Sequence, residues 1–422
     1  MIWKLFYNIV IVPILWLLFR IYSFMNAKAR RSWNGREELF ERLDKKLSRF
    51  STSEKRIWFH ASSMGEFEQA KPIVAELKKR YPSVRVIVSF FSSSGYEHSL
   101  SYKLADIITY IPFDSAQNAR RFVELIQPSA AIFMRYDLWP NHLWELNKRR
   151  IPSYLASATF HRKKYREMPL IKSFFRALYN SIDYILTVSS EDRDNFIAFK
   201  ISRPVIEEVG DTRYDQVWQR SADSRMKQLL DSKITADKKV IVIGSSWRED
   251  DVHLLTAINR LLLETKTLLI IWVPHEPTEE NLDYLEKEFN GKVSSIRFSH
   301  LHNYNGESII VVDSVGVLMP LYQYANIAYV GGGFSSGIHN VLEPAAYGIP
   351  VIFGPRHEKS QEAKFLLTSD GAKSVHSSEE IYQVFSILIK EEKKRLSNGR
   401  NAQALVRSKI GATERFMKFL KL

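Results

Sequence analysis

GGGFSSGIHNVLEPAAYGIP, at residues 331–350, is the most informative segment of this sequence. It follows the apolar run 327–330 and leads into another apolar run, so it joins a predicted strand, a glycine-rich loop, a helix and the next strand. Glycines let a backbone approach a phosphate closely, and a helix that begins near His339 and Asn340 favours an anion at its N-terminus. Glu343, one turn further on, can accept hydrogen bonds from ribose hydroxyls. The segment therefore predicts a nucleotide-sugar site, although it is neither a dinucleotide fingerprint nor a P-loop.

Short β-rich runs alternate with longer amphipathic runs on both sides of this segment, which predicts parallel α/β sheets. A first series of strands occupies 56–60, 84–90, 107–111, 130–134, 153–156, 184–188 and 205–209, and a second occupies 240–243, 268–273, 309–312, 327–330 and 350–353. We therefore expect two Rossmann-like domains that face a central cleft at the carboxyl ends of their strands. The predicted parts are an N-terminal anchor at 1–30, a first domain at 31–211, a linker at 212–236, a second domain at 237–400 and a final helix at 401–422.

Two acidic motifs follow strands of the first domain. In HASSMGE, residues 60–66, Gly65 permits a tight turn and Glu66 begins an amphipathic helix, where its carboxylate can act as a general base or can simply stabilise the helix dipole. In RYDLWPN, residues 135–141, Asp137 can orient an acceptor or stabilise positive charge on a sugar ring, and the alternative is that it caps the next helix.

Other strand ends supply groups for a nucleotide. Pro274 and His275 follow one strand of the second domain, and the loop 313–318 follows another. The histidines form no HExxH array, and no Asp-x-Asp motif stands where a cation-dependent glycosyltransferase would need one, so we predict no metal requirement. Without a metal, protein groups must neutralise a departing phosphate, and Arg213 and Arg248 are candidates.

The composition indicates an anionic partner. The formal net charge is +13, which suits nucleic acid, an acidic bilayer or a phosphorylated substrate, and the absence of cysteine excludes disulfides and thiolate metal sites. Residues 9–19 form an apolar run of eleven residues flanked by cations, shorter than the roughly 20 that span a bilayer. A shallow or interfacial anchor is therefore preferred to a span or a cleaved signal peptide. The segment Lys148 to Arg176 holds nine Lys or Arg and one acid, and is either a second membrane contact or a solvated basic surface.

Taken together, the motifs resemble those of bacterial 3-deoxy-D-manno-octulosonic acid (Kdo) transferases. The resemblance covers nearly the whole chain, in order, through HASSMGE, RYDLWPN, GDTRYD (210–215), VDSVGVL (312–318) and GGGFSSGIHNVLEPAAYGIPVIFGP (331–355). It implies a GT-B fold and an inverting transfer of Kdo from CMP-Kdo to a lipid A precursor, lipid IVA, in lipopolysaccharide synthesis. It also implies that no metal is needed and that the enzyme acts at the cytoplasmic side of the inner membrane, on an anionic membrane surface.

The same resemblance assigns roles to individual residues. Glu66 matches the proton acceptor, and Asp137 and Arg213 match positions that stabilise the transition state. The residues implied to hold CMP are Pro274, His275, Gly316, Val317, Leu318, Asn340, Val341, Leu342 and Glu343. The sequence departs from the commonest pattern in three places, because Asp137 replaces Glu, Arg213 replaces Lys, and Pro274-His275 replaces Pro-Arg-His.

Two other functions are alternatives. A different metal-independent GT-B enzyme with a UDP-sugar donor would share the architecture. A basic nucleic-acid-binding protein would share the charge, but the sequence has no interleaved basic and aromatic reader motif, so we expect no nucleic-acid partner.

Overall fold

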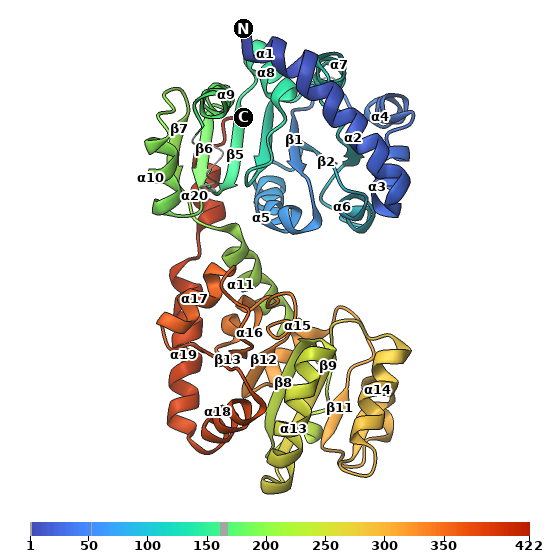
Figure 1. The fold of residues 1–422 in the computed structure, drawn as a ribbon, viewed down its shortest axis with the longest axis vertical. Coiled ribbons are helices and arrows are strands. Elements are labelled where there is room, and N and C mark those ends of the chain that lie inside the picture. The colour runs from blue at the N-terminus through green and yellow to red at the C-terminus, as the bar shows by residue number, and fades with distance from the viewer. Residues whose placement is uncertain (1, 52, 161–167) are drawn as a thin grey trace. The chain divides into compact units, whose positions relative to one another are not determined.

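The chain folds into two compact units, each built on a seven-stranded parallel sheet (Figure 1). The structure is a computed structural model that describes residues 2–51, 53–160 and 168–422. Unit 1 comprises Met1–Gln216 with Ile410–Leu422, and unit 2 comprises Val217–Lys409. The two Rossmann-like parallel sheets predicted from the sequence are confirmed.

The sheet of unit 1 has the strand order β3-β2-β1-β4-β5-β6-β7. Apolar side chains lie on both of its faces, as expected for a parallel sheet covered by helices on both sides. Along β1, Trp58 joins one core cluster whereas Ile57 and Phe59 join the other. The strands are β1 Arg56–Ala61, β2 Arg85–Phe90, β3 Ile107–Tyr110, β4 Ala130–Met134, β5 Ser153–Ala158, β6 Tyr184–Thr187 and β7 Val205–Glu208. The helices between them are α5 Met64–Arg80, α6 Ser93–Ser99, α7 Ala116–Ile126, α8 Pro140–Lys148, α9 Pro169–Tyr179 and α10 Ser190–Ala198.

The sheet of unit 2 has the order β10-β11-β9-β8-β12-β13-β14. Its strands are β8 Lys239–Ser246, β9 Leu268–Pro274, β10 Ser295–Arg297, β11 Ile309–Val311, β12 Ile327–Val330, β13 Val351–Phe353 and β14 Ala372–Ser374. Its helices are α12 Ser232–Thr235, α13 Arg248–Glu264, α14 Glu279–Phe289, α15 Leu318–Leu321, α16 Leu342–Tyr347, α17 Gln361–Thr368, α18 Ser378–Lys390 and α19 Glu392–Ser408. The edge strands β10 and β14 were not predicted, because each has only three residues and two of the three in each are polar.

Two elements differ from the sequence-based expectation near the division between the units. The single final helix expected over 401–422 is two helices, α19 and α20 Ala412–Phe419, because Gly411 adopts a φ of 95° that ends the helical path. Helix α20 packs on the sheet of unit 1, where Phe416 and Met417 join the core. Helix α11, Thr212–Ser224, begins in unit 1 and ends in unit 2.

Both sheets have a point at which the strand order reverses. In unit 1 the chain proceeds outward from β1 through β2 and β3, then returns to β4 on the other side of β1. In unit 2 it proceeds from β8 to β9 and on to the edge strand β10, comes back to β11 between β10 and β9, and then crosses to β12 on the other side of β8. Ligands of open parallel sheets bind beside such reversal points, at the carboxyl ends of the strands. The topology therefore directs attention to the loops after β1 and β4, and after β8 and β12.

The N-terminal segment is helical. The elements α1 Ile2–Phe6, η1 Tyr7–Ile11 and α2 Val12–Met25 form one helix of 24 residues, with a π-helical turn at η1. Two shorter helices follow, α3 Ala27–Asn34 and α4 Leu39–Leu47. Within the described residues, 2–25 is the one helix long and apolar enough to cross a membrane by length and composition.

Candidate active site

Glu66 lies in the first turn of α5, directly after β1. Its Oε2 accepts the backbone N–H of Ser62 at 2.6 Å and that of Ser63 at 3.3 Å, which satisfies donors at the helix N-terminus. The side chain is almost buried. The tight turn expected at Gly65 is not found, because Gly65 lies within α5 and a Cβ placed there would meet nothing within 4 Å. Open space therefore adjoins Gly65, the residue before Glu66.

Asp137 follows β4 and is held by three donors. Its Oδ2 accepts a hydrogen bond from His60 Nε2 at 2.7 Å, from Trp139 Nε1 at 3.0 Å and from the hydroxyl of Ser62. On the other side of the imidazole, His60 Nδ1 lies 2.8 Å from the hydroxyl oxygen of Ser89. Asp137 does not cap α8 with its side chain, since the N-cap of that helix is Trp139. These contacts bring the HASSMGE and RYDLWPN motifs together at the reversal point of the sheet.

The two carboxylates have opposite pKa shifts. Burial raises the pKa of Glu66 to about 7, and the negative charge of Asp137 adds to this effect against the backbone N–H groups and the charge of Arg135. Burial also favours the neutral form of Asp137, but the hydrogen bonds and charge of His60, with those of Ser62 and Trp139, hold the pKa of Asp137 below its ordinary value. Such a pair provides one constant anion and one group poised to exchange a proton near neutral pH.

Arg213, the third predicted catalytic residue, lies in the first turn of α11. Its Nε and Nη2 both contact Oδ2 of Asp211, at 2.9 and 2.6 Å. Oδ1 of Asp211 accepts the Arg213 backbone N–H at 2.9 Å and lies 3.3 Å from Gln69 Nε2. Because Gln69 is on α5, this network fixes the start of α11 relative to the helix that carries Glu66. The guanidinium of Arg213 remains partly exposed.

In unit 2, a pocket of about 270 Å³ lies beside the reversal point of the sheet. Four of the residues predicted to hold CMP line it, namely Gly316, Leu318, Asn340 and Glu343. The other predicted positions are outside its lining: Val317, Val341 and Leu342 are in the same loops and helix starts, whereas Pro274 ends β9 and His275 follows it. Further lining residues were not predicted, and they are Arg220, Gly244, Ser245, Met319, Tyr322, Val330 and His339.

Three aromatic rings stack at the rim of this pocket. His275 lies between Trp247 and His339, with ring centroids 4.4 and 4.3 Å apart. Trp247 Nε1 donates to His339 Nε2 at 2.8 Å, and because an indole N–H can only donate, this nitrogen of His339 carries no proton. Burial, followed by the neighbouring His275, lowers the pKa of His339 to about 4. His339 is therefore neutral at pH 7 and has its proton on Nδ1.

The glycine-rich loop is fixed by a carboxylate that was not predicted. Asp250, fully buried in α13, accepts the backbone N–H of Gly332 at 2.7 Å and that of Trp247 at 3.0 Å, and also the hydroxyl of Tyr329 at 3.0 Å. A Cβ on Gly331 would lie 2.2 Å from the carbonyl oxygen of Ser245. The first glycines thus serve close backbone packing, and the N–H group of Gly332 donates to Asp250 and not to a phosphate.

The sequence of this chain is similar to those of known proteins. Residues 37–216 match the family model described as 3-Deoxy-D-manno-octulosonic-acid transferase (kdotransferase). A 3-deoxy-D-manno-octulosonic acid transferase of Haemophilus influenzae is 28% identical over 99% of this chain and 98% of its own length. The enzyme of that name from Aquifex aeolicus is 29% identical over 75% of this chain and 80% of its own length. The chain is thus similar to Kdo transferases, which are glycosyltransferases, over most of its length.

Solved structures agree with the GT-B class predicted for this chain. UDP-GlcNAc 2-epimerase from Neisseria meningitidis bound to UDP-GlcNAc superimposes with a TM-score of 0.58, at 15% identity over 86% of this chain and all of that one. MurG of Acinetobacter baumannii gives a TM-score of 0.56, at 13% identity over 86% of this chain and 98% of its own. At these identities the likeness shows the fold alone.

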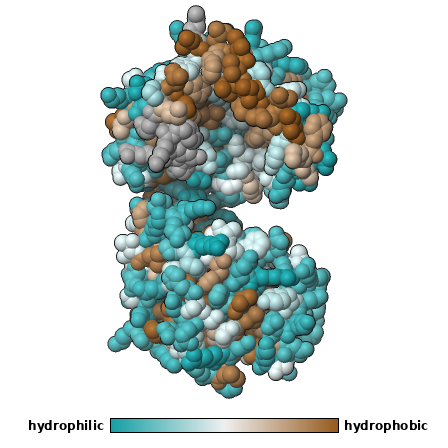
Figure 2. All heavy atoms as spheres, in the orientation of Figure 1, coloured by the Kyte–Doolittle hydropathy of each residue, from teal (hydrophilic) through white to brown (hydrophobic). Residues whose placement is uncertain are grey.

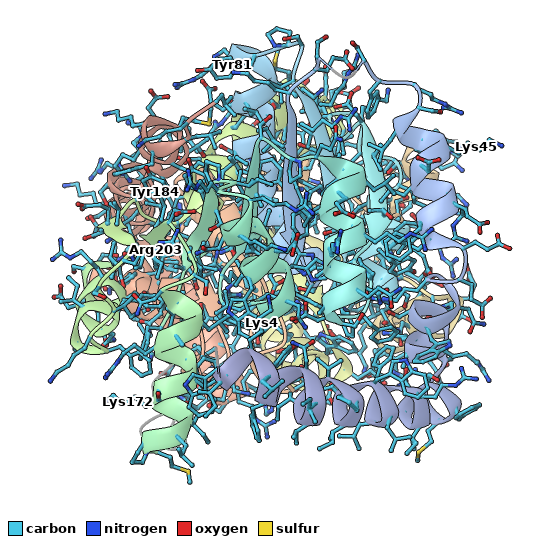
Figure 3. All side chains as sticks on the ribbon, turned by 90° about the horizontal axis from the view of Figure 1, so that it is seen from above. Lys4, Lys45, Tyr81, Lys172, Tyr184 and Arg203 are labelled. Carbon is cyan, nitrogen blue, oxygen red and sulfur yellow. The ribbon has the colours of Figure 1, made fainter. Side chains whose placement is uncertain are left out.

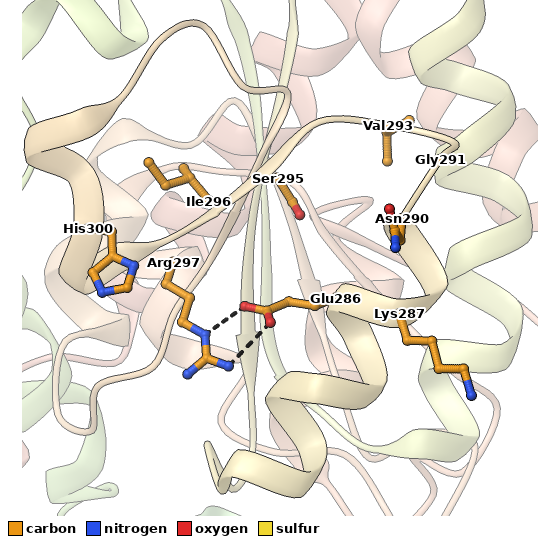
Figure 4. Close-up of a pocket in the computed structure, with 9 residues that line it drawn as sticks. All are labelled: Glu286, Lys287, Asn290, Gly291, Val293, Ser295, Ile296, Arg297 and His300. Atoms are coloured by element: carbon orange, nitrogen blue, oxygen red, sulfur yellow. Dashed lines mark hydrogen bonds and ion pairs between the residues drawn. The ribbon is translucent and has the colours of Figure 1, made fainter.

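A second, larger hollow in unit 2 is a poor anion site. It has a volume of about 670 Å³ and lies between α14 and β10 (Figure 4). Its guanidinium, Arg297, contacts Glu286 at 2.6 Å, Glu279 at 2.9 Å and Asp283 at 3.1 Å. Three carboxylates thus neutralise the cation, so the smaller pocket at the reversal point is the better candidate for a nucleotide.

The family motifs mark some of the site but not all of it. His60 lies inside HASSMGE, yet its role depends on Asp137, 77 residues away, which spacing cannot reveal. Arg220 lines the pocket. Arg248, which was predicted as a candidate cation for the departing phosphate, contacts Glu280 at 2.7 Å and is outside the lining. Among the described residues, no group of three or more His, Cys, Asp or Glu side chains is arranged to hold a metal ion.

Proposed function

We propose that the protein transfers Kdo from CMP-Kdo to a sugar hydroxyl of a lipid A precursor, lipid IVA, with inversion at the anomeric carbon. The observation that carries the proposal is the carboxylate pair at the reversal point of the first sheet, in a chain similar to Kdo transferases. Glu66, with a pKa of about 7, is suited to accept a proton, and Asp137 beside it stays charged.

The proposed reaction is a displacement at the anomeric carbon of Kdo. Glu66 takes the proton of the acceptor hydroxyl as its oxygen forms the new glycosidic bond, and the bond from Kdo to the CMP phosphate breaks. The negative charge of Asp137 stabilises positive charge that develops on the sugar ring. The positive charge of Arg213 stabilises negative charge on the departing phosphate in the transition state. We propose that no metal takes part, since the partly exposed Arg213 and the pocket residue Arg220 provide cations for the phosphate.

We assign the donor to the pocket of unit 2. Gly316, Leu318, Asn340 and Glu343 line it, and Glu343 is placed to accept from ribose hydroxyls. Asn340 Nδ2 lies 3.2 Å from Glu343 Oε1, and its own Oδ1 accepts the N–H of Leu342 at 3.1 Å, so the two polar side chains hold one another in position. Pro274, His275, Val317, Val341 and Leu342 complete the proposed CMP contacts, and His275 does so through its stack with His339.

The similarity to Kdo transferases and the apolar N-terminal helix support a lipid acceptor and a location at the membrane. A lipid acceptor is reached most readily by an enzyme on the membrane, and residues 2–25 form a helix apolar enough to attach there. We place the enzyme at the cytoplasmic side of the inner membrane. Part of the predicted basic segment, residues 161–167, lies outside the described residues.

The product of the reaction tests this function. Purified protein is incubated with a CMP-Kdo-generating system and the lipid A precursor, and the lipid is weighed by mass spectrometry. The proposal predicts a mass increase of one or more Kdo residues that depends on CMP-Kdo. An unchanged lipid with folded protein would contradict it.

The choice of nucleotide separates the proposal from a UDP-sugar enzyme. A ligand that binds only the folded state raises the melting temperature. We expect CMP to raise it more than UDP at equal concentration. Protection by UDP with none by CMP would favour a UDP-sugar donor.

A further inference from the structure

The N-terminal helix lies against unit 1 near its two ends and is most exposed in the middle, where Trp16 still contacts Trp33. Trp3, Tyr7 and Asn8 contact the body of the unit near one end, and Phe19 packs on aromatic rings near the other. Every residue from 13 to 18 is exposed. Because six consecutive residues cover more than one full turn, apolar side chains are exposed on all sides of the helix there.

Buried polar contacts attach the first half of this helix. The hydroxyl of Tyr7 donates to Oδ2 of Asp114 at 2.8 Å, and both residues are buried. Asn8 and Asn141 exchange two amide hydrogen bonds, each 2.9 Å long. Asp114 also accepts the backbone N–H groups of Asn141 and His142, at 3.1 and 3.2 Å. The helix is thus joined to the start of α8, which follows the segment that carries Asp137.

The outer surface of the helix is strongly apolar. Figure 2 shows apolar side chains gathered along it, and Figure 3 shows a row of them pointing away from the body of unit 1. The large exposed apolar residues are Ile2, Leu5, Phe6, Ile9, Ile14, Leu15, Trp16, Leu17, Leu18, Ile21, Tyr22, Phe24 and Met25. A patch of this extent on a soluble surface marks an interaction site.

Helix α9 extends this surface at one end. Trp3 Nε1 donates to the hydroxyl of Ser173 at 3.2 Å, and the Trp3 ring packs on Phe174 at 5.8 Å. Near the start of α9, Met168 and Leu170 are exposed, and Leu170 keeps 74% of its surface accessible. Figure 3 shows α9, which carries Lys172, beside the N-terminal helix. The two helices therefore present apolar side chains from separate parts of the sequence.

Charge identifies what covers the surface. Exposed Lys4, Lys28 and Arg30 flank the apolar stretch, so cations stand at both of its ends. Trp16 and Tyr22 are exposed within it, and such rings favour the boundary between headgroups and acyl chains. A helix of this composition suits the surface of a bilayer that contains anionic lipid.

We propose that residues 2–25 lie in the plane of one leaflet of an anionic lipid bilayer, together with the first turn of α9, and do not cross it. A crossing helix would have to leave unit 1, which would remove the Tyr7 partner of the buried Asp114 and the Asn8 partner of the buried Asn141, and would carry Tyr7 and Asn8 into hydrocarbon. An in-plane helix keeps these contacts and buries its outer surface in the leaflet. The inference deepens the membrane attachment proposed above.

The absence of cysteine makes the topology directly testable. Single-cysteine variants Lys4→Cys and Lys28→Cys report the two ends of the helix, and Lys79→Cys, whose side chain is 80% exposed on α5, reports the body of unit 1. Cells producing each full-length variant yield sealed inside-out membrane vesicles, which are treated with a membrane-impermeant maleimide. We expect all three positions to be labelled without detergent. Labelling of Lys79→Cys and Lys28→Cys, with Lys4→Cys labelled only after detergent, would show a crossing helix and overturn the proposal.

The depth of the middle of the helix gives a second measurement. A fluorophore on Leu15→Cys is compared in vesicles of phosphatidylethanolamine and phosphatidylglycerol whose lipids carry bromine either near the headgroup or near the bilayer centre. We expect stronger quenching by the shallow bromines, since interfacial helices sit about 5–10 Å deep. Stronger quenching by the deep bromines, or no quenching because a protein partner covers the patch, would overturn the proposal. The same fluorophore on Lys79→Cys should not be quenched. Neither measurement requires Kdo transfer, so this topology and the proposed reaction fail independently.

Discussion

Glu66 and Asp137 differ in the partners that surround them, and this difference sets their chemistry. Glu66 is almost buried and lies near the negative charge of Asp137, so its pKa is raised to about 7 although it accepts backbone N–H groups that oppose this rise. Asp137 faces an imidazole, an indole and a hydroxyl, all of which donate to its Oδ2, and its pKa is lowered. One residue is thereby suited to exchange a proton and the other to remain an anion.

The pH dependence of turnover follows from the pKa of Glu66. A general base works only when it is deprotonated, so we expect kcat to rise through about pH 7 and to level off above it. Initial rates of Kdo transfer between pH 5.5 and 9 measure this dependence. A rate that is flat from pH 5.5 to 8 would contradict the role of Glu66.

Removing the charge of Asp137 should move that profile. The negative charge of Asp137 helps to raise the pKa of Glu66, so Asp137→Asn should shift the midpoint of the pH profile below that of the parent and lower the maximum rate. The asparagine oxygen can still accept from His60, which keeps the geometry. A lowered rate with an unmoved midpoint would mean that the two carboxylates do not interact.

The same pKa shift has a consequence for stability. Because the pKa of Glu66 is raised from 4.5 to about 7, the folded protein binds more protons than the unfolded chain between these values, and stability from this residue falls as the pH rises across that window. Glu66→Gln, which cannot ionise, should therefore be more stable than the parent at pH 8, and the gain should shrink toward pH 5. Urea unfolding midpoints at the two pH values test this, and an equal midpoint shift at both would count against it.

At the scale of elements, each site depends on how a loop is fixed after its strand. Asp250 fixes the loop after β12 by accepting the N–H groups of Gly332 and Trp247 and the Tyr329 hydroxyl. It lies in the first turn of α13, so the start of this helix and the glycine-rich loop share one carboxylate. The pocket beside them is shaped by that shared contact.

Removal of this carboxylate should loosen unit 2. Asp250→Ala leaves several buried donors without an acceptor, each at a cost of about 1–3 kcal/mol, so we expect a large loss in the free energy of unfolding and loss of thermal protection by CMP. Glu249→Ala is the matched control, because Glu249 is exposed in the same turn. Denaturant unfolding should show a change within about 0.5 kcal/mol for the control. Equal stability of the two variants would refute the role given to Asp250.

The strands could be predicted because each long strand is a nearly continuous apolar run, as β1 and β9 are. The three-residue strands β10 and β14 lacked that signal and form through pairing with longer neighbours. The site was predicted only where a residue lies in a motif, as Glu66 and Asp137 do. His60, Asp250 and Arg220 depend on contacts between distant segments, which no local pattern encodes.

At the scale of the whole molecule, the two units carry different parts of the proposed reaction. Unit 1 carries the carboxylate pair and the N-terminal helix, which is linked through Asn8 and Asn141 to the start of α8. Unit 2 carries the pocket beside the glycine-rich loop. A substitution of Glu66, the proposed base in unit 1, should therefore lower the rate of transfer without weakening the binding of a nucleotide by unit 2.

Turnover and nucleotide binding measured on one preparation of Glu66→Gln test this division most directly. Loss of a general base costs about 10² to 10⁴ in rate, so Kdo transfer to the lipid A precursor should fall by that factor, while CMP should raise the melting temperature as much as it does for the parent protein. Transfer within a few-fold of the parent, with CMP protection intact, would contradict the assignment of Glu66 as the base.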